Sequence, residues 1–194
     1  MPGIENPILF EIPEHFETER LIIRAPRPGD GQVLNEAVVE SFPSLLAWIP
    51  WAHNLPTISD SEKTVCNDAL RWQNRDDLRM LIFRKSDNLL AGGMGLYRID
   101  WSIPKYEIGY WLRTSLEGQG YMTEAVNGMT RFAMETLQAE RIEIICEARN
   151  VGSSAVARRA GYPLEATMRR SSRGKDGKLV DMEMYVLLRT EWSG

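Results

Sequence analysis

The chain has 194 residues, of which 43% are hydrophobic and 26% are charged, and its formal net charge is −4. This composition is typical of a soluble globular protein, and the length predicts one domain whose core needs no disulfide or metal. The nearly balanced charge gives no reason to expect direct binding to nucleic acid.

The hydrophobic pattern predicts strands and helices along the whole chain. In chain order they are a strand (20–25), two helices (30–49 and 59–74), three strands (78–85, 89–99 and 105–112), a helix (121–135), a strand (141–148), a helix (150–160) and two strands (162–170 and 180–189). Pro43 is expected to break the first helix, and a capping box at Ser59 and Glu62 to start the second. Gly161 suits a left-handed cap at the end of the last helix.

Three strands in succession indicate an antiparallel meander, and the later alternation of helices and strands adds a mixed sheet. The fold class predicted is α/β, a single domain over residues 1–194. It has a mostly antiparallel sheet of about seven strands, flanked by about four helices.

Cysteine and histidine are scarce in this chain. Cys66 and Cys146 lie far apart without C-x-x-C spacing, which predicts two buried thiols in a reducing compartment. With only His15 and His53, neither a zinc site nor a serine–histidine triad is expected. The first residues lack a signal-peptide pattern, and no apolar run is long enough to span a bilayer. We therefore expect a cytoplasmic protein with no metal and no membrane partner.

The stretch EIGYWLRTSLEGQGYMTEA (107–125) places Gly118 and Gly120 between a strand and a helix. A helix N-terminus offers unpaired N–H groups and a partial positive charge, and glycines let a ligand approach its backbone closely. A ligand that carries phosphate is therefore indicated. A tight strand-to-helix connection without any ligand is the alternative that the glycine pair alone leaves open.

Two common phosphate motifs do not fit. A P-loop needs a lysine directly after its second glycine, and Tyr121 follows Gly120. A dinucleotide fingerprint needs a third glycine in the first βαβ unit, whereas three strands precede this pair.

Four segments resemble, in order and spacing, the GNAT superfamily of acyl-CoA-dependent N-acyltransferases: EIGYWL, GQGYMTEA, RNVGSSAVARRAGY and DMEMYVLLRTEW. They look most like the branch of RimJ/RimL-type ribosomal-protein N-terminal acetyltransferases. TERLIIRAPRPGD and WIPWA are also similar to that branch, so the resemblance covers the chain from Thr18 to Trp192. It implies a central sheet that splays open, acetyl-CoA as cosubstrate, and a homodimer as a common state.

The family's phosphate loop is written [QR]-x-x-G-x-[GA], and this chain departs from it at Glu117 and Met122. Backbone amides bind the pyrophosphate, so Glu117 need not abolish binding. A carboxylate near two phosphates is still unfavourable unless it faces solvent or pairs with Arg113.

The resemblance also implies which residues bind the cosubstrate. The strand end at Trp111, Leu112 and Arg113 would align the pantetheine arm, and the Leu112 amide would stabilise the oxyanion. Asn150 would bind the arm, and Ser153 would sit by the sulfur as proton donor, although both residue types are also common helix caps. The pyrophosphate would lie on the amides of the loop and helix start: Gly118, Gln119, Gly120, Tyr121, Met122 and Thr123.

The glutamate that serves as general base in RimL-like enzymes falls on Ser172, so that base is missing. Glu107 is the best remaining carboxylate; a surface residue paired with a cation is the alternative. Water relay or an amine that arrives neutral would need no base.

The N-terminal half and a basic segment are candidates for further contacts. Trp48, Trp51 and Trp72 could line an acceptor pocket, although Trp72 suits the core. Residues 158–178 hold seven basic and two acidic side chains. They form either a solvated face or a contact to an acidic acceptor, or to the 3′-phosphate of CoA through Arg158 or Arg159.

The sequence thus predicts an acetyl-CoA-dependent N-acetyltransferase that acts by direct attack in a ternary complex. The acceptor is an amine, on either a protein N-terminus or a small molecule. A non-catalytic acyl-CoA sensor or assembly subunit on the same fold is the rival prediction, because fold alone does not fix function.

Overall fold

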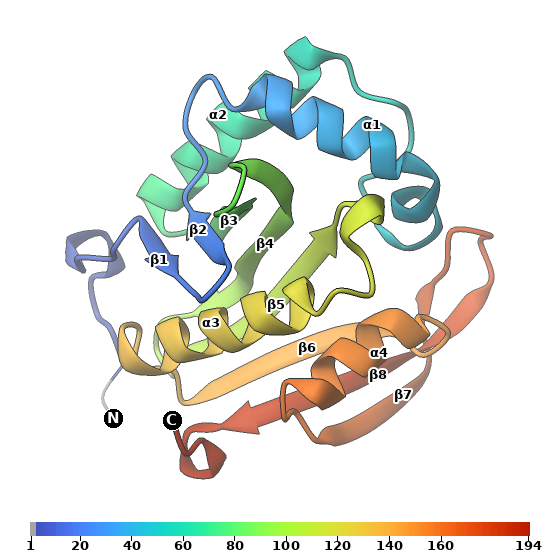
Figure 1. The fold of residues 1–194 in the computed structure, drawn as a ribbon. Coiled ribbons are helices and arrows are strands. Elements are labelled where there is room, and N and C mark those ends of the chain that lie inside the picture. Colours follow the sequence, from blue (N-terminus) through green and yellow to red (C-terminus); the bar gives the residue numbers. More distant parts are fainter. Residues whose placement is uncertain (1–2) are drawn as a thin grey trace.

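All the predicted strands form, and together with one short strand they build a single sheet in the order β1-β2-β3-β4-β5-β6-β8-β7 (Figure 1). The computed structural model describes residues 3–194. The strands are β1 (His15–Glu17), β2 (Leu21–Arg24), β3 (Leu78–Arg84), β4 (Leu89–Asp100), β5 (Lys105–Leu112), β6 (Arg141–Glu147), β7 (Leu164–Arg173) and β8 (Leu179–Leu188). The α-helices are α1 (Gly31–Trp48), α2 (Ile58–Asn74), α3 (Tyr121–Glu135) and α4 (Val151–Arg159).

The sheet opens between β5 and β6, which are the one parallel pair of strands in residues 3–194. β5 and β6 are paired only from Lys105–Glu107 to Arg141–Glu143. Beyond that point β5 stays paired with β4 as far as Leu112, while β6 stays paired with β8 as far as Glu147. The two strands therefore diverge, as Figure 1 shows for the yellow-green and gold ribbons. This confirms the splayed sheet that the resemblance implied.

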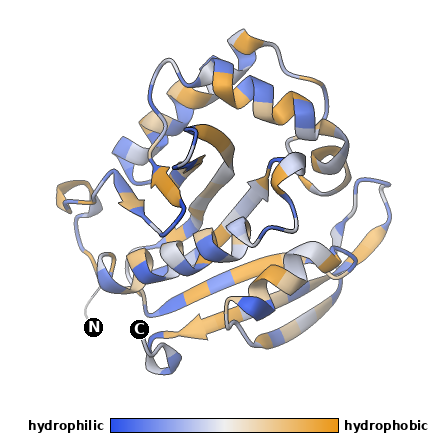
Figure 2. Ribbon diagram, viewed as in Figure 1, coloured by the Kyte–Doolittle hydropathy of each residue, from blue (hydrophilic) through white to orange (hydrophobic). Residues whose placement is uncertain are grey.

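Successive residues of a strand point to opposite faces of the sheet, and the core divides accordingly. On one face Met80 and Ile82 belong to the cluster that includes Met129 of α3. On the other face Leu81 and Phe83 pack with α1 and α2. Apolar residues run along much of β6 and β8, and the helices alternate between apolar and polar (Figure 2). Each face of the sheet is thus covered by its own pair of helices.

α1 continues through Pro43, so the predicted break was wrong. Pro43 lacks the N–H that would bond the carbonyl of Val39. Both residues are exposed, so this part of the helix is open to solvent.

The start of α2 also differs from the prediction. Thr57 and Asp60 form the capping box instead of Ser59 and Glu62. Glu62 accepts the N–H groups of Gly29 (2.7 Å) and Gly31 (2.8 Å) and so caps α1. Gly161 has φ +83°, as expected for the residue that ends α4.

Candidate active site

The start of α3 presents uncapped amides. Gly118 (φ +74°) and Gly120 (φ +82°) are both left-handed, a conformation that favours glycine. Gly120 is the N-cap residue of α3, and no side chain caps this helix. The first amides of the helix (121–123) therefore have no hydrogen-bond partner among residues 3–194 and can receive an anion.

Arg20, at the start of β2, holds this turn in place. Its guanidinium donates to the Gln119 carbonyl (3.1 Å) and to the Glu124 carboxylate (2.6 Å), and it stacks 4.3 Å from the centre of the Tyr121 ring. Burial raises the pKa of Glu124, but the hydrogen bonds from Thr18 and Arg20 outweigh it and lower the pKa overall. Sequence reasoning missed Arg20. The signal was Glu124 itself, because a carboxylate in the first turn of an anion-binding helix requires a cationic partner.

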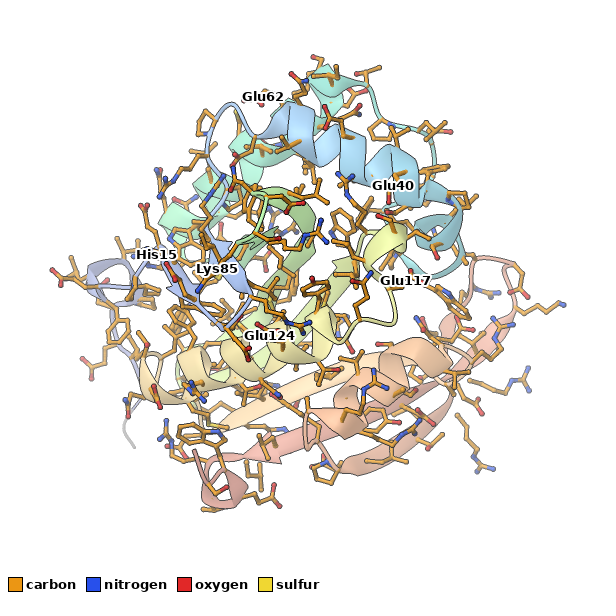
Figure 3. All side chains as sticks on the ribbon, viewed as in Figure 1. His15, Glu40, Glu62, Lys85, Glu117 and Glu124 are labelled. Carbon is orange, nitrogen blue, oxygen red and sulfur yellow. The ribbon has the colours of Figure 1, made fainter. Side chains whose placement is uncertain are left out.

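Arg113 does not pair with Glu117, which was the alternative considered from the sequence. Its guanidinium donates to Glu40 of α1 (2.8 Å) and to the Leu90 carbonyl (3.0 Å), and it is buried. Glu117 belongs to the connection that joins β5 to α3, and Glu40 lies on the neighbouring helix α1 (Figure 3). Arg113 therefore anchors the end of β5 to α1 through its side chain.

The edge of β5 offers free amides to the gap between the strands. The Arg113 N–H donates to the Ala91 carbonyl of β4 (2.7 Å). Amide directions alternate along a strand, so the Leu112 and Tyr110 N–H groups point the other way, toward β6. β6 is no longer paired there. The Leu112 amide is thus placed to receive an oxygen of a ligand in the gap.

The start of α4 lies across this gap. The Asn150 side chain accepts the Ser153 N–H (3.1 Å) and is the cap of the helix. The Ser153 hydroxyl has no capping role, because its Oγ lies 3.0 Å from the hydroxyl of Tyr110 on β5. Tyr110 also donates to the Ser153 carbonyl (3.1 Å). Burial raises the pKa of Tyr110, which therefore stays protonated. Tyr110 is a second residue that sequence reasoning missed.

One cavity of about 680 Å³ joins these features. Of the predicted residues, those that line it are Trp111, Leu112, Gly118, Gly120, Met122, Thr123, Asn150 and Ser153. Glu117 and Tyr110 also line it, whereas Arg113, Gln119 and Tyr121 do not. Uncapped helix amides, a free strand edge and a hydroxyl pair therefore face one space.

Comparison with known proteins identifies the family. A model described as the acetyltransferase (GNAT) domain matches residues 20–163. The chain belongs to the GNAT acetyltransferases. This confirms the resemblance, the fold class and an acetyl-CoA-dependent N-acetyltransferase as the activity.

Three relatives illustrate the match. A protein of Bacillus subtilis (strain 168) named "Putative ribosomal N-acetyltransferase YdaF" is 31% identical over 176 residues, which is 91% of this chain and 95% of that protein. The ribosomal-protein-serine acetyltransferase of Escherichia coli (strain K12) is 27% identical over 154 residues, 79% of this chain and 85% of that protein. A solved structure of RimL, the ribosomal L7/L12 alpha-N-protein acetyltransferase in complex with coenzyme A, has a TM-score of 0.81 at 26% identity and covers 91% of this chain and 97% of that chain.

Glu107, the predicted base, lies on the opposite face of the GNAT sheet from Tyr110 and Leu112. It is five residues before Leu112, about 16 Å along the strand. Its carboxylate accepts from Arg98 (2.8 Å) and is 16% exposed. Burial raises its pKa, Arg98 opposes the shift, and the Glu143 carboxylate adds to it. Glu107 therefore does not face the Leu112 amide directly.

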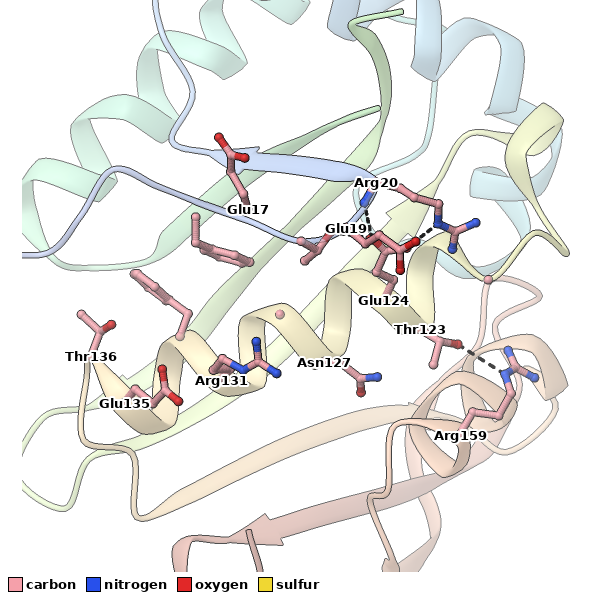
Figure 4. A pocket seen from close by; sticks show the side chains of 15 residues that line it. Glu17, Glu19, Arg20, Thr123, Glu124, Asn127, Arg131, Glu135, Thr136 and Arg159 are labelled. Carbon is pink, nitrogen blue, oxygen red and sulfur yellow. Dashed lines mark hydrogen bonds and ion pairs between the residues drawn. The ribbon is translucent and has the colours of Figure 1, made fainter. Parts of the chain in front are cut away.

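A second hollow of about 780 Å³ adjoins the first along the outer face of α3 (Figure 4). The two share Gly120, Thr123 and Arg159. Arg159 donates to Thr123 (3.3 Å), whereas Arg158 points away and donates to the Tyr185 hydroxyl (3.0 Å). Of the two arginines predicted to meet a 3′-phosphate, only Arg159 lies beside the helix start.

The remaining residues that the sequence singled out differ in how far they are buried. Trp72 is buried in the core, as expected. Trp51 is half exposed and meets Trp111 edge to face at 6.5 Å, and Trp48 is exposed. Cys146 is buried and Cys66 only partly so, and both are free thiols. Within residues 3–194, no group of His, Cys, Asp and Glu is placed to hold a metal ion, and no helix could cross a membrane.

Proposed function

We propose that this enzyme binds acetyl-CoA across the gap between β5 and β6, with the pyrophosphate on the amides of 121–123. The single observation that supports this most is the uncapped α3 N-terminus, which opens into the same cavity as the free edge of β5. The pantetheine arm pairs with that edge and with Asn150. The nucleotide end leaves toward the second hollow, where Arg159 meets the 3′-phosphate.

The acetyl group then lies beside the Leu112 amide and the Ser153 hydroxyl. The nitrogen lone pair of a neutral amine attacks the thioester carbon, and the Leu112 N–H stabilises the oxyanion. The intermediate collapses as the C–S bond breaks, and the proton lost by nitrogen ends on the CoA sulfur. The products are an N-acetyl amide and CoA with a free thiol.

Ser153 acts mainly as a hydrogen-bond donor to the departing sulfur. A thiol has a pKa of about 8.5, far below that of an alcohol, so a thiolate cannot hold a proton taken from Ser153. Either hydroxyl can be the donor in the 3.0 Å contact between Tyr110 and Ser153. When the single O–H of Tyr110 turns from the Ser153 carbonyl to the Ser153 Oγ, the Ser153 O–H is free to donate to the sulfur. The proton that finally resides on sulfur comes from the acceptor nitrogen, through this hydroxyl pair or through water.

Direct attack is favoured over an acetyl-cysteine intermediate. Cys146 is the cysteine near this site, with its Sγ 3.5 Å from the Ser154 hydroxyl. Burial raises the pKa of the Cys146 thiol, which keeps it protonated and a poor nucleophile. The amine therefore reacts with acetyl-CoA in a ternary complex.

Glu107 serves as the base in this proposal when the acceptor arrives as an ammonium. Through water it takes one proton from the ammonium before attack and later releases that proton to solvent, while the second nitrogen proton ends on the sulfur. Its raised pKa strengthens it as a base relative to an ordinary glutamate. The distance to Leu112 rules out direct contact with the attacking nitrogen, so a relay of several water molecules is required.

The acceptor that we propose is the N-terminal amine of a protein, in the cytoplasm. The support is that relatives matching most of this chain are named as ribosomal N-acetyltransferases. An α-amino group has a pKa of about 7.7–8.0, so a substantial fraction is neutral near pH 7. A homodimer, common in the family, remains a prediction.

The test is release of CoA thiol from acetyl-CoA with a panel of N-terminal peptides, and with the same peptides acetylated beforehand as controls. We expect thiol release that equals the acetyl-peptide found by mass spectrometry. If CoA binds but no amine in the panel is acetylated, the protein is a non-catalytic acyl-CoA sensor instead.

A further inference from the structure

Glu117 is one of two charged residues that line the cavity proposed for acetyl-CoA, and the other is Arg159. It lies in the connection between β5 and α3, directly before Gly118 (Figure 3). Glu117 is exposed, and its carboxylate has no hydrogen bond or ion pair with any other residue among 3–194. The loop that receives the pyrophosphate in our proposal therefore carries an unpaired negative charge.

Two arginines that hold this loop already have carboxylate partners. Arg113, at the end of β5, donates to Glu40 (2.8 Å). Arg20, which holds the turn before α3, pairs with Glu124 (2.6 Å). Each pair carries no net charge as a whole. Neither arginine therefore offsets the charge of Glu117, although both are close to the same loop in the fold.

The start of α3 is the positive counterpart of Glu117. The N–H groups of 121–123 have no hydrogen-bond partner among residues 3–194, and they give this end of the helix a partial positive charge. Without a ligand, Glu117 and this helix end attract each other. When a pyrophosphate occupies the amides, Glu117 instead faces charges of its own sign. The same carboxylate thus stabilises the empty site and destabilises the occupied one.

We propose that Glu117 lowers the affinity for the phosphates of CoA and thereby speeds the release of product CoA. This inference rests on the proposed function, because it uses the site assigned there to the pyrophosphate. CoA and acetyl-CoA carry the same phosphates, so Glu117 weakens the binding of both and does not favour one over the other. It shortens the time that either stays bound, and product release limits turnover in many enzymes.

Calorimetry of CoA binding tests the effect of the charge. Glu117→Gln removes the charge and keeps the size of the side chain, and we expect its Kd for CoA at low salt to be about fivefold lower than that of the wild type. The difference should nearly vanish at about 1 M salt, where charges are screened beyond about 3 Å. Glu117→Asp keeps the charge and should bind CoA as the wild type does.

Glu36→Gln is the matched control. It makes the same change in net charge at an exposed residue of α1 that lines neither the cavity nor the second hollow. Its Kd for CoA should equal that of the wild type. Equal tightening in Glu36→Gln and Glu117→Gln would mean that the net charge of the protein sets the affinity, and it would overturn the inference.

Acetyl-pantetheine is a second probe, because it keeps the thioester and the pantetheine arm and lacks the phosphates. With the best peptide of the panel as acceptor, wild type and Glu117→Gln should have the same kcat/KM for acetyl-pantetheine. The kcat/KM for acetyl-CoA should be about fivefold higher in Glu117→Gln. Equal gains with both thioesters would show that Glu117 acts on the arm or the acceptor, and would contradict an effect on the phosphates.

Stopped-flow displacement of bound CoA measures the release itself. We expect CoA to leave Glu117→Gln about fivefold more slowly than it leaves the wild type, with the rate of association little altered. A change confined to association would overturn the claim about release. CoA binding with equal Kd in wild type and Glu117→Gln would overturn this inference alone. No CoA binding by either enzyme would overturn the proposed function as well.

Discussion

At the scale of single residues, Ser153 and Ser154 stand side by side with different tasks. The Ser153 hydroxyl meets Tyr110 at the edge of the gap, whereas the Ser154 hydroxyl donates to Glu183 (2.7 Å) within the protein. Asn150 caps the helix, so neither hydroxyl is needed as its cap. The structure therefore assigns the cap to Asn150, which sequence spacing alone could not do, and leaves the Ser153 hydroxyl free for the role proposed above.

Ser153→Ala is expected to lower kcat by roughly 10²-fold, with acetyl-CoA KM little altered, because the departing sulfur loses a hydrogen-bond donor. The stability loss should be about 1 kcal/mol, that of one hydrogen bond. Steady-state kinetics and melting curves measure both effects.

Tyr110→Phe should lower kcat by a smaller factor, about tenfold. Ser154→Ala is the control, with a stability loss and normal kcat. A normal kcat in Ser153→Ala would leave this residue without a chemical role.

Glu107→Gln tests the base and gives a pH signature. A base must be deprotonated, so activity that depends on Glu107 falls as the pH drops through its raised pKa, which lies above the usual 4.5. We expect kcat at saturating acceptor to fall about 10- to 100-fold and the acidic limb of the pH profile to disappear. Retention of both kcat and that limb would mean that the amine arrives neutral and that Glu107 is only the partner of Arg98.

At the scale of elements, the loop before α3 depends on two left-handed glycines. Gly120→Asp adds a carboxylate where the pyrophosphate is expected, and aspartate tolerates this conformation at a cost of about 1 kcal/mol. We expect a folded protein whose CoA affinity, measured by calorimetry, is at least about tenfold weaker. Gly177→Asp is matched in substitution and nearly in φ (+76°), and should bind CoA normally. Equal CoA binding by Gly120→Asp and wild type would make the glycine pair a mere connector.

Elements with a strong hydrophobic period could be predicted from the sequence, and those chosen by distant contacts could not. The spacing of the apolar residues predicts α3 and the longer strands. β1 has three residues and no buried side chain, so it leaves no pattern. Residue type and spacing alone do not distinguish two possible capping boxes, Thr57-x-x-Asp60 and Ser59-x-x-Glu62. Only the contact of Glu62 with the start of α1 decides between them.

The residues of the candidate site also fall into two groups, those that local sequence motifs predict and those that depend on distant contacts. Gly118, Gly120, Asn150 and Ser153 sit in local motifs, so their neighbours in sequence reveal them. Sequence analysis did not find Tyr110 and Arg20, because their partners are 43 and about 100 residues away in the chain. The prediction for Arg113 concerned its backbone at the strand end. The contact of its side chain with Glu40 of α1 could not be predicted, because the sequence does not show which residues of α1 approach β5.

At the scale of the whole molecule, the sheet is continuous except where β5 and β6 diverge. The cavity that we propose for acetyl-CoA lies at this divergence. It is lined by the starts of α3 and α4 and also by Ser44, Leu45 and Ile49, at or just after the end of α1. Lys175 ties the β7–β8 hairpin to the loop after α1.

Ligand binding should stabilise the whole fold by mass action. CoA at 100 times its Kd adds about 2.7 kcal/mol to the free energy of unfolding. For a chain of this size that raises the melting temperature by about 5–10 °C. NAD and ATP lack the pantetheine arm that pairs with β5, so they should shift it much less. Equal shifts with CoA, NAD and ATP would indicate a general nucleotide site.

The central claim is that the β5 edge and the α3 N-terminus together hold the cosubstrate, and amide hydrogen exchange followed by NMR tests it most directly. In the free enzyme the N–H groups of Tyr110, Leu112 and 121–123 have no partner within the described part of the chain, and they should exchange rapidly. With CoA bound, exchange at these positions should slow at least about tenfold, while amides at the exposed hairpin tip (175–178) stay unchanged. CoA that binds without slowing exchange at Leu112 and at 121–123 would contradict this account.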